Sequence, residues 1–270
     1  MTIDAGTIAH WQTWVGRQEQ REEMVDPEAL RRFAAALGEE LDVERHWPSL
    51  GHWALFLPVV GADQVGDDGH PKRGGFLPPI TLPRRMFASA EIRFTGRLAL
   101  GAPATRTSTI RDVRHRAGGS GTLVLVDVEH VIAQRGTNHV VERQTLVYRE
   151  AGGQTPPVTA GEPGSGEIWT PGEADLFRFS AATFNGHRIH YDLPYAQGEE
   201  GYPALVVHGP FTAARLFGLA RRTEGEPAAF AFRAQAPIFL GQPVRLAAGE
   251  RTYTARRADG LDAMVAKTVL

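Results

Sequence analysis

The chain has 270 residues, of which 42% are hydrophobic and 22% charged, the composition of a globular protein with a sizeable core. Its 29 basic and 31 acidic residues give a net charge of −2, so we expect no nucleic-acid or membrane-surface partner. The absence of cysteine excludes disulfides, thiolate nucleophiles and Cys-ligated metals. No apolar run reaches the roughly 18 residues that span a bilayer, and the first residues do not resemble a signal peptide. We therefore expect a cytoplasmic protein.

In the first half, the sequence predicts one helix, a long loop and a meander of strands. The helix covers residues 26–38, with Asp26 at its N-cap, Gly38 just past its end and an apolar stripe between them. Residues 61–80, rich in Gly, Asp and Pro, predict a loop of the length that often carries function. Four runs with strand patterns between residues 88 and 150 predict an antiparallel meander with one buried face.

The second half follows a similar order. Residues 151–170 have the composition of a linker. Residues 210–220 are apolar nearly all round, which predicts a buried helix. Three strand-like runs follow, at residues 228–240, 244–257 and 262–270. The second meander is therefore predicted to be one strand shorter than the first.

A short repeat supports a duplicated unit. Leu-Gly-x-Pro ends the first strand of each meander, at residues 100–103 and again at 240–243, about half a chain later. The order of elements predicts an α+β double hotdog, two helix-wrapped antiparallel sheets in one chain that pair edge to edge. We expect an N-terminal hotdog over 1–150, a linker over 151–170 and a C-terminal hotdog over 171–270. Such a pseudo-dimer is expected to be a monomer or a homodimer.

Two segments of the second half carry the chemistry. Residues 179–192 read FSAATFNGHRIHYD, and residues 205–210 read LVVHGP. A neutral imidazole such as His190 can move a proton near pH 7. A helix that begins at Gly209 leaves free N–H groups and a positive dipole end. A base facing such an oxyanion site suits removal of the α-proton of a thioester, with the enolate oxygen on the Gly209 N–H.

The same segments resemble the MaoC-type hotdog hydratases and dehydratases. In this resemblance the catalytic His falls on His190 and the central-helix Gly on Gly209. The family's catalytic Asp falls on Asn185, its Asn on His187 and its Pro on Arg188. Together with GGFLPPITLPRRMF at residues 74–87, these departures are similar to the branch of mesaconyl-C4-CoA hydratases and type 2 hydroxyacyl-thioester dehydratases, in which the Asn is normal.

The resemblance implies reversible syn addition of water to a 2-enoyl-CoA, without a cofactor and without a metal. His190 is the implied general acid/base and Gly209 the implied oxyanion donor. Asn185 would orient the water or the carbonyl, and His187 would supply a second proton-transfer group.

The first half, which lacks the HRIHYD motif, would form a wall of the substrate tunnel. In that wall an arginine, Arg84 or Arg85, would grip a substrate carboxylate. The other expected substrate contacts are Met86, Tyr191 and His208.

Several alternatives stay open. His187 and His190 could be structural, or could bind a metal together with Asp192. His208 could serve only as a hydrogen-bonding residue at the helix entry, and the arginine pair could be solvated. His115, His130 and His139 lie in strand patterns and look like sheet residues. Competing functions are a thioesterase and a non-catalytic acyl-CoA-binding protein, and competing substrates are a mesaconyl-type dicarboxylyl-CoA and a straight-chain (R)-3-hydroxyacyl thioester.

Overall fold

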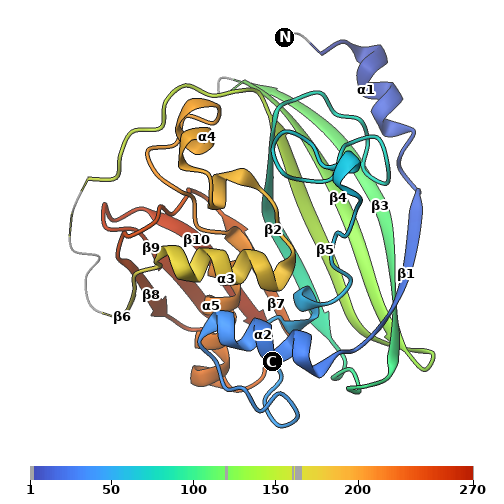
Figure 1. Ribbon diagram of the computed structural model, residues 1–270, viewed down its shortest axis with the longest axis vertical. Coiled ribbons are helices and arrows are strands. Elements are labelled where there is room, and N and C mark those ends of the chain that lie inside the picture. Colours follow the sequence, from blue (N-terminus) through green and yellow to red (C-terminus); the bar gives the residue numbers. More distant parts are fainter. Residues whose placement is uncertain (1–2, 119–120, 160, 162–165, 270) are drawn as a thin grey trace.

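The computed structural model describes residues 3–118, 121–159, 161 and 166–269 (Figure 1). Its strands form one ten-stranded antiparallel sheet in the order β1-β3-β4-β5-β2-β7-β10-β9-β8-β6. The strands of the first half are β1 (Gln18–Met24), β2 (Arg84–Phe94), β3 (Pro103–Gly118), β4 (Gly121–Gln134) and β5 (Thr137–Arg149). Those of the second half are β6 (Glu167–Trp169), β7 (Ala229–Ala234), β8 (Val244–Ala248), β9 (Thr252–Arg256) and β10 (Asp262–Val269).

The order of strands is the same when the sheet is read inwards from either edge. Each half runs from an outer strand (β1 or β6) through its meander to an inner strand (β2 or β7). The two halves join where residues 89–93 of β2 pair with residues 229–233 of β7. The predicted edge-to-edge pairing of two sheets is thereby confirmed.

The structure corrects two details of the strand prediction. The second half is not one strand short, because the run at 244–257 folds back at residues 249–251 into the hairpin of β8 and β9. The outer strands β1 and β6 were not predicted. The sequence of β1, QEQREEM, has one apolar residue and so shows no alternation, and β6 has three residues inside the expected linker.

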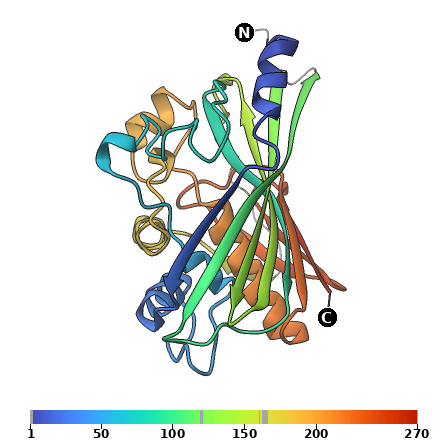
Figure 2. The ribbon, with the colours of Figure 1, turned by 90° about the vertical axis from the view of Figure 1, so that its right-hand side faces the viewer.

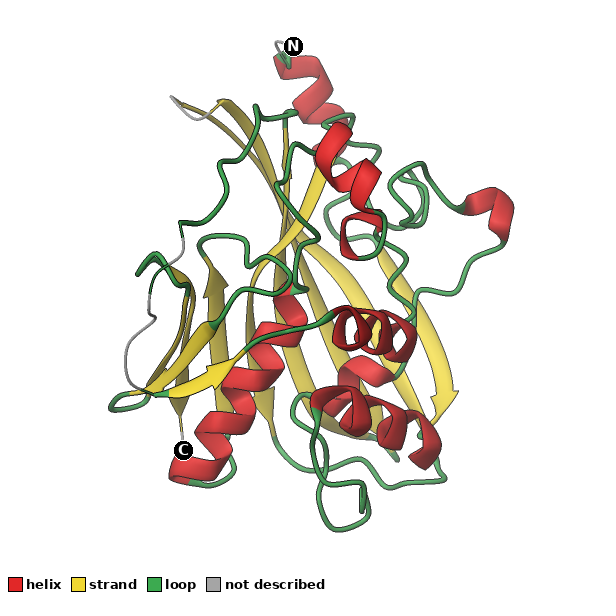
Figure 3. Cartoon of the chain, turned by 60° about the vertical axis from the view of Figure 1, so that its left-hand side comes forward, coloured by secondary structure: helices red, strands yellow, loops and turns green. Residues whose placement is uncertain are grey.

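The helices are α1 (Ala5–Gln12), α2 (Pro27–Leu37), α3 (Glu173–Thr183), α4 (Leu193–Gly198) and α5 (Gly209–Glu224). Helices α1 and α5 lie directly against strands, whereas α2, α3 and α4 pack mainly on other helices and on 3-10 turns. Short 3-10 turns are η1 (Gly51–Ala54), η2 (Ala62–Gln64) and η3 (Arg188–His190). Helix α2 is confirmed with its caps: Asp26 accepts the Glu28 and Ala29 N–H groups, and Gly38 has a φ of 69°. Helix α5 runs along the strands of the second half and is longer than predicted (Figure 3).

The repeat relates different helices from those expected. Helix α2 follows β1 as α3 follows β6, and these two helices pack together, with the Phe33 and Phe179 rings 5.7 Å apart. Between this helix and the inner strand, the first half has η1 and η2, where the second half has η3, α4 and α5. The prediction that α2 is the counterpart of α5 is therefore wrong.

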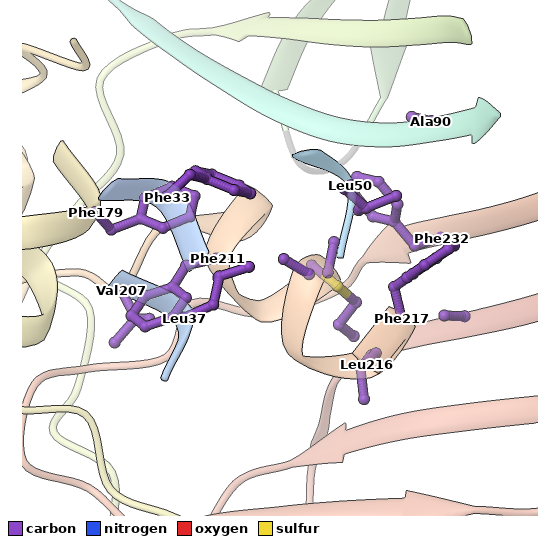
Figure 4. Close-up of a cluster of buried hydrophobic side chains, with 14 of the residues drawn as sticks. Phe33, Leu37, Leu50, Ala90, Phe179, Val207, Phe211, Leu216, Phe217 and Phe232 are labelled. Carbon is purple, nitrogen blue, oxygen red and sulfur yellow. The ribbon is translucent and has the colours of Figure 1, made fainter. Parts of the chain in front are cut away.

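The main core fills the space between α2, α3, α5 and the sheet (Figure 4). Figure 2 shows α2 and α3 on the same side of the sheet. Phe179 of α3 stacks on Phe211 of α5 at 4.8 Å, beside Phe33 of α2. A second cluster packs Trp11 of α1 and the segment around Ile80 and Leu82 onto β3, β4 and β5. This second cluster anchors the end of the long loop 61–80 to the sheet.

Candidate active site

A cavity of about 1420 Å³ opens between the two halves of the sheet. Strand β2 begins at Arg84, but only residues 89–93 of β2 pair with β7. The first residues of β2 therefore extend past the end of β7 and line the cavity. The opposite walls come from the end of α3, the segment 184–191, the start of α5 and residues 234–238. The structure thus gathers most of the site residues that the sequence singled out, from both halves.

His190 lies in η3, buried against the cavity wall with 7% exposure. Its Nδ1 lies 2.7 Å from the Val206 carbonyl oxygen, and the Val206 N–H donates to Ile189 O at 3.0 Å. Because a carbonyl only accepts hydrogen bonds, Nδ1 of His190 must carry the proton, and Nε2 then has a free lone pair. Burial, followed by the neighbouring histidines His208 and His187, holds the pKa of His190 well below its usual value. His190 is therefore a neutral base at pH 7.

His208 lies behind His190, not in the cavity wall. The two rings stack at 3.6 Å, and His208 Nε2 makes a 2.8 Å hydrogen bond with Ser180 Oγ. His208 has no exposed surface, and burial lowers its pKa to about 3. The expectation that His208 contacts substrate is wrong, because His190 lies between it and the ligand space. His208 is the N-cap residue of α5, as the helix-entry alternative holds.

Gly209 is the first residue of α5 and lines the cavity. Its N–H belongs to the first helical turn and donates to none of the described residues. A Cβ placed here would lie 3.6 Å from the Phe87 carbonyl oxygen, which is ordinary contact. Packing therefore does not require glycine at this position, and Gly209 borders space that a ligand can occupy.

Asn185 and His187 lie next to each other on the cavity wall. Asn185 Oδ1 accepts the backbone N–H of His187 at 3.0 Å, which leaves the amide NH₂ group without a described partner. His187 is 5% exposed, and its Nε2–H points to Glu200 Oε1 at 3.3 Å. The sequence analysis missed Glu200, which lies in no motif.

Glu200 also decides the role of Arg84. The Arg84 guanidinium donates to the Glu200 carbonyl oxygen, its Nε lies 3.6 Å from the Glu200 carboxylate, and it covers the Tyr202 ring at 5.5 Å. Arg84 is only 5% exposed. Although it borders the cavity, its charge is already paired, so the expectation that it grips a substrate carboxylate is not supported.

Arg85 is different. It lines the cavity, is half-buried, and has no carboxylate within ion-pair distance in the described part of the chain. Arg149, which the sequence analysis did not single out, also lines the cavity, is half-buried and has no carboxylate within ion-pair distance among the described residues. It lies opposite Arg84 in the register of β2 and β5. Both cations are available to an anionic ligand.

The long loop 61–80 contributes a further histidine. Gly69 of this loop has a φ of 85° and lies against the segment 179–192, so closely that a Cβ at Gly69 would be 1.9 Å from Gly186 O. Next to it, His70 lines the cavity with its ring 4.2 Å from that of His187, and its Nδ1 lies 3.3 Å from Asp68 Oδ2. Burial and then Arg85 lower the pKa of His70 to about 3. The loop prediction located this segment, but not its histidine.

Met86 and Tyr191 both line the cavity as expected. Tyr191 stands at the mouth, 54% exposed, and donates to Gly186 O at 3.0 Å. Asp192 turns away from the histidines: it accepts from Arg188 and caps α4 through the Tyr195 N–H. In the part of the chain that the structure describes, no three His, Asp or Glu side chains are arranged to hold a metal ion.

His115, His130 and His139 lie in β3, β4 and β5, as their strand patterns predict. Among the described residues, no helix is long and apolar enough to cross a membrane.

Comparison with known proteins gives one family. The family model of hydroxyacyl-thioester dehydratase type 2 matches residues 47–240. Mesaconyl-C(4)-CoA hydratase of Chloroflexus aurantiacus is 45% identical over 275 aligned positions, which cover 97% of this chain and 98% of that protein.

Two solved structures share the fold. HtdX of Mycobacterium tuberculosis superposes with a TM-score of 0.69 at 18% identity, over 94% of this chain and 99% of that chain. A second Mycobacterium tuberculosis protein, described as a double hotdog, gives a TM-score of 0.54 at 10% identity, over 94% of this chain and 95% of that chain. The expected double hotdog fold is confirmed.

Proposed function

The chain belongs to the hydroxyacyl-thioester dehydratase type 2 family and is a hydro-lyase, and we propose that its substrate is a branched dicarboxylyl 2-enoyl-CoA of the mesaconyl-C4-CoA type. The observation that carries the proposal is the charge of the cavity. Among the described residues, three arginines and three histidines line it and no carboxylate does. One of the arginines, Arg85, lines the same cavity as His190 and Gly209 and has no carboxylate within ion-pair distance among the described residues.

In the proposed reaction His190 moves one proton. For hydration, Nε2 of His190 takes a proton from water while the hydroxyl oxygen bonds to C3 of the enoyl group. The electron pair of the double bond passes to the thioester oxygen, where the Gly209 N–H and the N-terminal end of α5 stabilise the enolate. His190 then returns its proton to C2 on the same face, so the addition is syn and no other proton acceptor is required. Dehydration is the reverse.

Asn185 and His187 support this step in the proposal. The free amide NH₂ of Asn185 can donate to the water oxygen or to the carbonyl. His187, oriented by Glu200, is the second group that can exchange a proton. The first half of the chain serves as the wall that carries Arg85, Met86 and the loop with His70.

The competing functions have less support. A thioesterase of this fold needs a carboxylate near the thioester carbonyl, whereas Glu200 is paired with Arg84 and His187 and does not line the cavity. A non-catalytic binding protein would not need a neutral imidazole at the cavity surface. A straight-chain (R)-3-hydroxyacyl thioester would leave Arg85 without a carboxylate partner. With a CoA thioester as substrate, we place the enzyme in the cytoplasm, as a monomer or a homodimer.

The proposal is tested by hydration of crotonyl-CoA and mesaconyl-C4-CoA at neutral pH, monitored by the loss of enoyl-thioester absorbance. We expect turnover of both, a preference for mesaconyl-C4-CoA, and a loss of at least 100-fold in kcat for His190→Ala, the size of a general acid/base contribution. Acyl-CoA binding without turnover in the wild type would contradict the proposal and favour a binding protein.

A further inference from the structure

A second, smaller cavity of about 110 Å³ lies beside the active-site cavity. Four residues line both cavities: Trp53, Pro58, Gln144 and Thr183. These residues form the partition between the two spaces. Trp53, which lies in η1, has the largest side chain of the four.

The indole of Trp53 is held from the small-cavity side. Its Nε1–H donates to the Glu142 carboxylate, at 3.1 and 3.2 Å from the two oxygens. Glu142 is 2% exposed, and it also accepts from Gln144 at 2.9 Å and from His52 at 3.1 Å. A buried carboxylate is stable only while such donors satisfy it. The Glu142 cluster therefore fixes the orientation of the indole.

On the side of the main cavity, Phe87 connects Gly209 with the same indole. The Phe87 carbonyl lies 3.6 Å from the Cβ position of Gly209, and the Phe87 ring meets the Trp53 ring edge-on at 6.0 Å. Phe232 contacts Trp53 from a second side, at 6.1 Å. A thioester with its carbonyl on the Gly209 N–H, and its acyl group directed along Phe87, meets the indole at the end of the pocket.

We propose that Trp53, held in place by Glu142, is the end wall of the acyl pocket and restricts the enzyme to short acyl groups. The proposal rests on the hydration reaction given above, and it adds which residue sets the length of the acyl group. The space behind the wall is large enough to matter: a cavity admits a water molecule from about 10–15 Å³, and this one has about 110 Å³.

The test is the ratio of kcat/KM for 2-octenoyl-CoA to that for crotonyl-CoA. Trp53→Phe removes the part of the ring system that reaches Glu142 and joins the two spaces. A methylene moved from water to an apolar site contributes about 0.8 kcal/mol, about fourfold. Each methylene that enters the enlarged pocket therefore raises the ratio by at most about fourfold, because Glu142 and Arg106 make the small cavity partly polar. Trp47→Phe is the matched control, since Trp47 packs on the main core and lines neither cavity. Its ratio is expected to equal that of the wild type.

An unchanged ratio in folded Trp53→Phe would overturn the proposal. If that variant does not fold, Gln144→Ala removes a smaller part of the same partition, and a rise of the ratio is expected there too. Calorimetric binding of butyryl-CoA and octanoyl-CoA separates this proposal from the reaction itself. Binding of these saturated thioesters does not depend on turnover. A selective gain in octanoyl-CoA affinity in Trp53→Phe would therefore support Trp53 as the end wall even if the wild type hydrated neither enoyl-CoA. No gain would count against Trp53 as the end wall.

Discussion

Arg85 and Arg84 are adjacent in sequence, yet the structure gives them opposite roles, and separate substitutions can distinguish them. Arg85 lines the cavity with no carboxylate partner among the described residues, whereas Arg84 is buried against Glu200. We expect Arg85→Gln to reduce the use of a dicarboxylyl substrate and to leave the fold intact. We expect Arg84→Gln to weaken the site as a whole.

The magnitudes follow from burial and charge. A hydrogen bond to a charged group contributes about 1.5–3 kcal/mol, so Arg85→Gln should lower kcat/KM for mesaconyl-C4-CoA by about 10- to 160-fold. The acyl group of crotonyl-CoA has no free carboxylate, so its kcat/KM should change by about twofold at most. Removal of one partner from a buried ion pair costs about 3–5 kcal/mol, so Arg84→Gln should lower Tm by roughly 6–20 °C and affect both substrates alike.

The assay is steady-state hydration of both thioesters by wild type and the two variants, with thermal unfolding of each. Arg84→Gln serves as the matched control, because it removes the same charge from the neighbouring position. Equal loss of both substrates in Arg85→Gln would refute the reasoning, since a carboxylate grip must discriminate between them. So would a selective loss of mesaconyl-C4-CoA in Arg84→Gln alone.

Two further predictions concern the start of α5. Gly209→Ala should fold with unchanged Tm, because its Cβ meets Phe87 only at ordinary contact distance. Its kcat/KM should fall at least tenfold, because the methyl group obstructs the thioester carbonyl. Full activity in that variant would argue against the oxyanion site. His208 is neutral when folded, with a pKa lowered to about 3 against about 6.5 when unfolded, so its contribution to stability is present above pH 6.5 and lost as the pH falls towards 3. Between about pH 6 and pH 4, the free energy of unfolding measured with urea should fall with falling pH by about 1.4 kcal/mol per pH unit less in His208→Gln than in the wild type. Parallel curves would contradict this.

The sequence predicted best the features that depend on near neighbours. The caps of α2 are Asp26 and Gly38, which act on residues within one turn. Alternation predicted the strands that bury one face, but it could not show β1, which is charged along its length and pairs with β3 some 80 residues later. The helix repeat was misassigned because the sequence analysis found one helix ahead of each meander and did not predict α3. The packing of α2 on α3 is visible only in three dimensions.

The motif of the second half was likewise local. His190 and Gly209 were identified from two short segments, and the structure brings both to one cavity. What surrounds them comes from distant parts of the chain: Arg84 is bonded to Glu200, 116 residues away, and Trp53 to Glu142, 89 residues away. Neither partner lies in a motif, so no spacing in the sequence pointed to them.

The sequence by itself therefore determined the family resemblance, the double arrangement of helices and strands, and the base and helix start that suit thioester chemistry. Only the tertiary structure decided which arginine is available, which histidines face the ligand and where the acyl pocket ends. The physical reason is that a side chain's residue type sets its intrinsic charge and hydrogen-bonding groups, whereas its available charge depends on burial and on the partners that folding brings within reach.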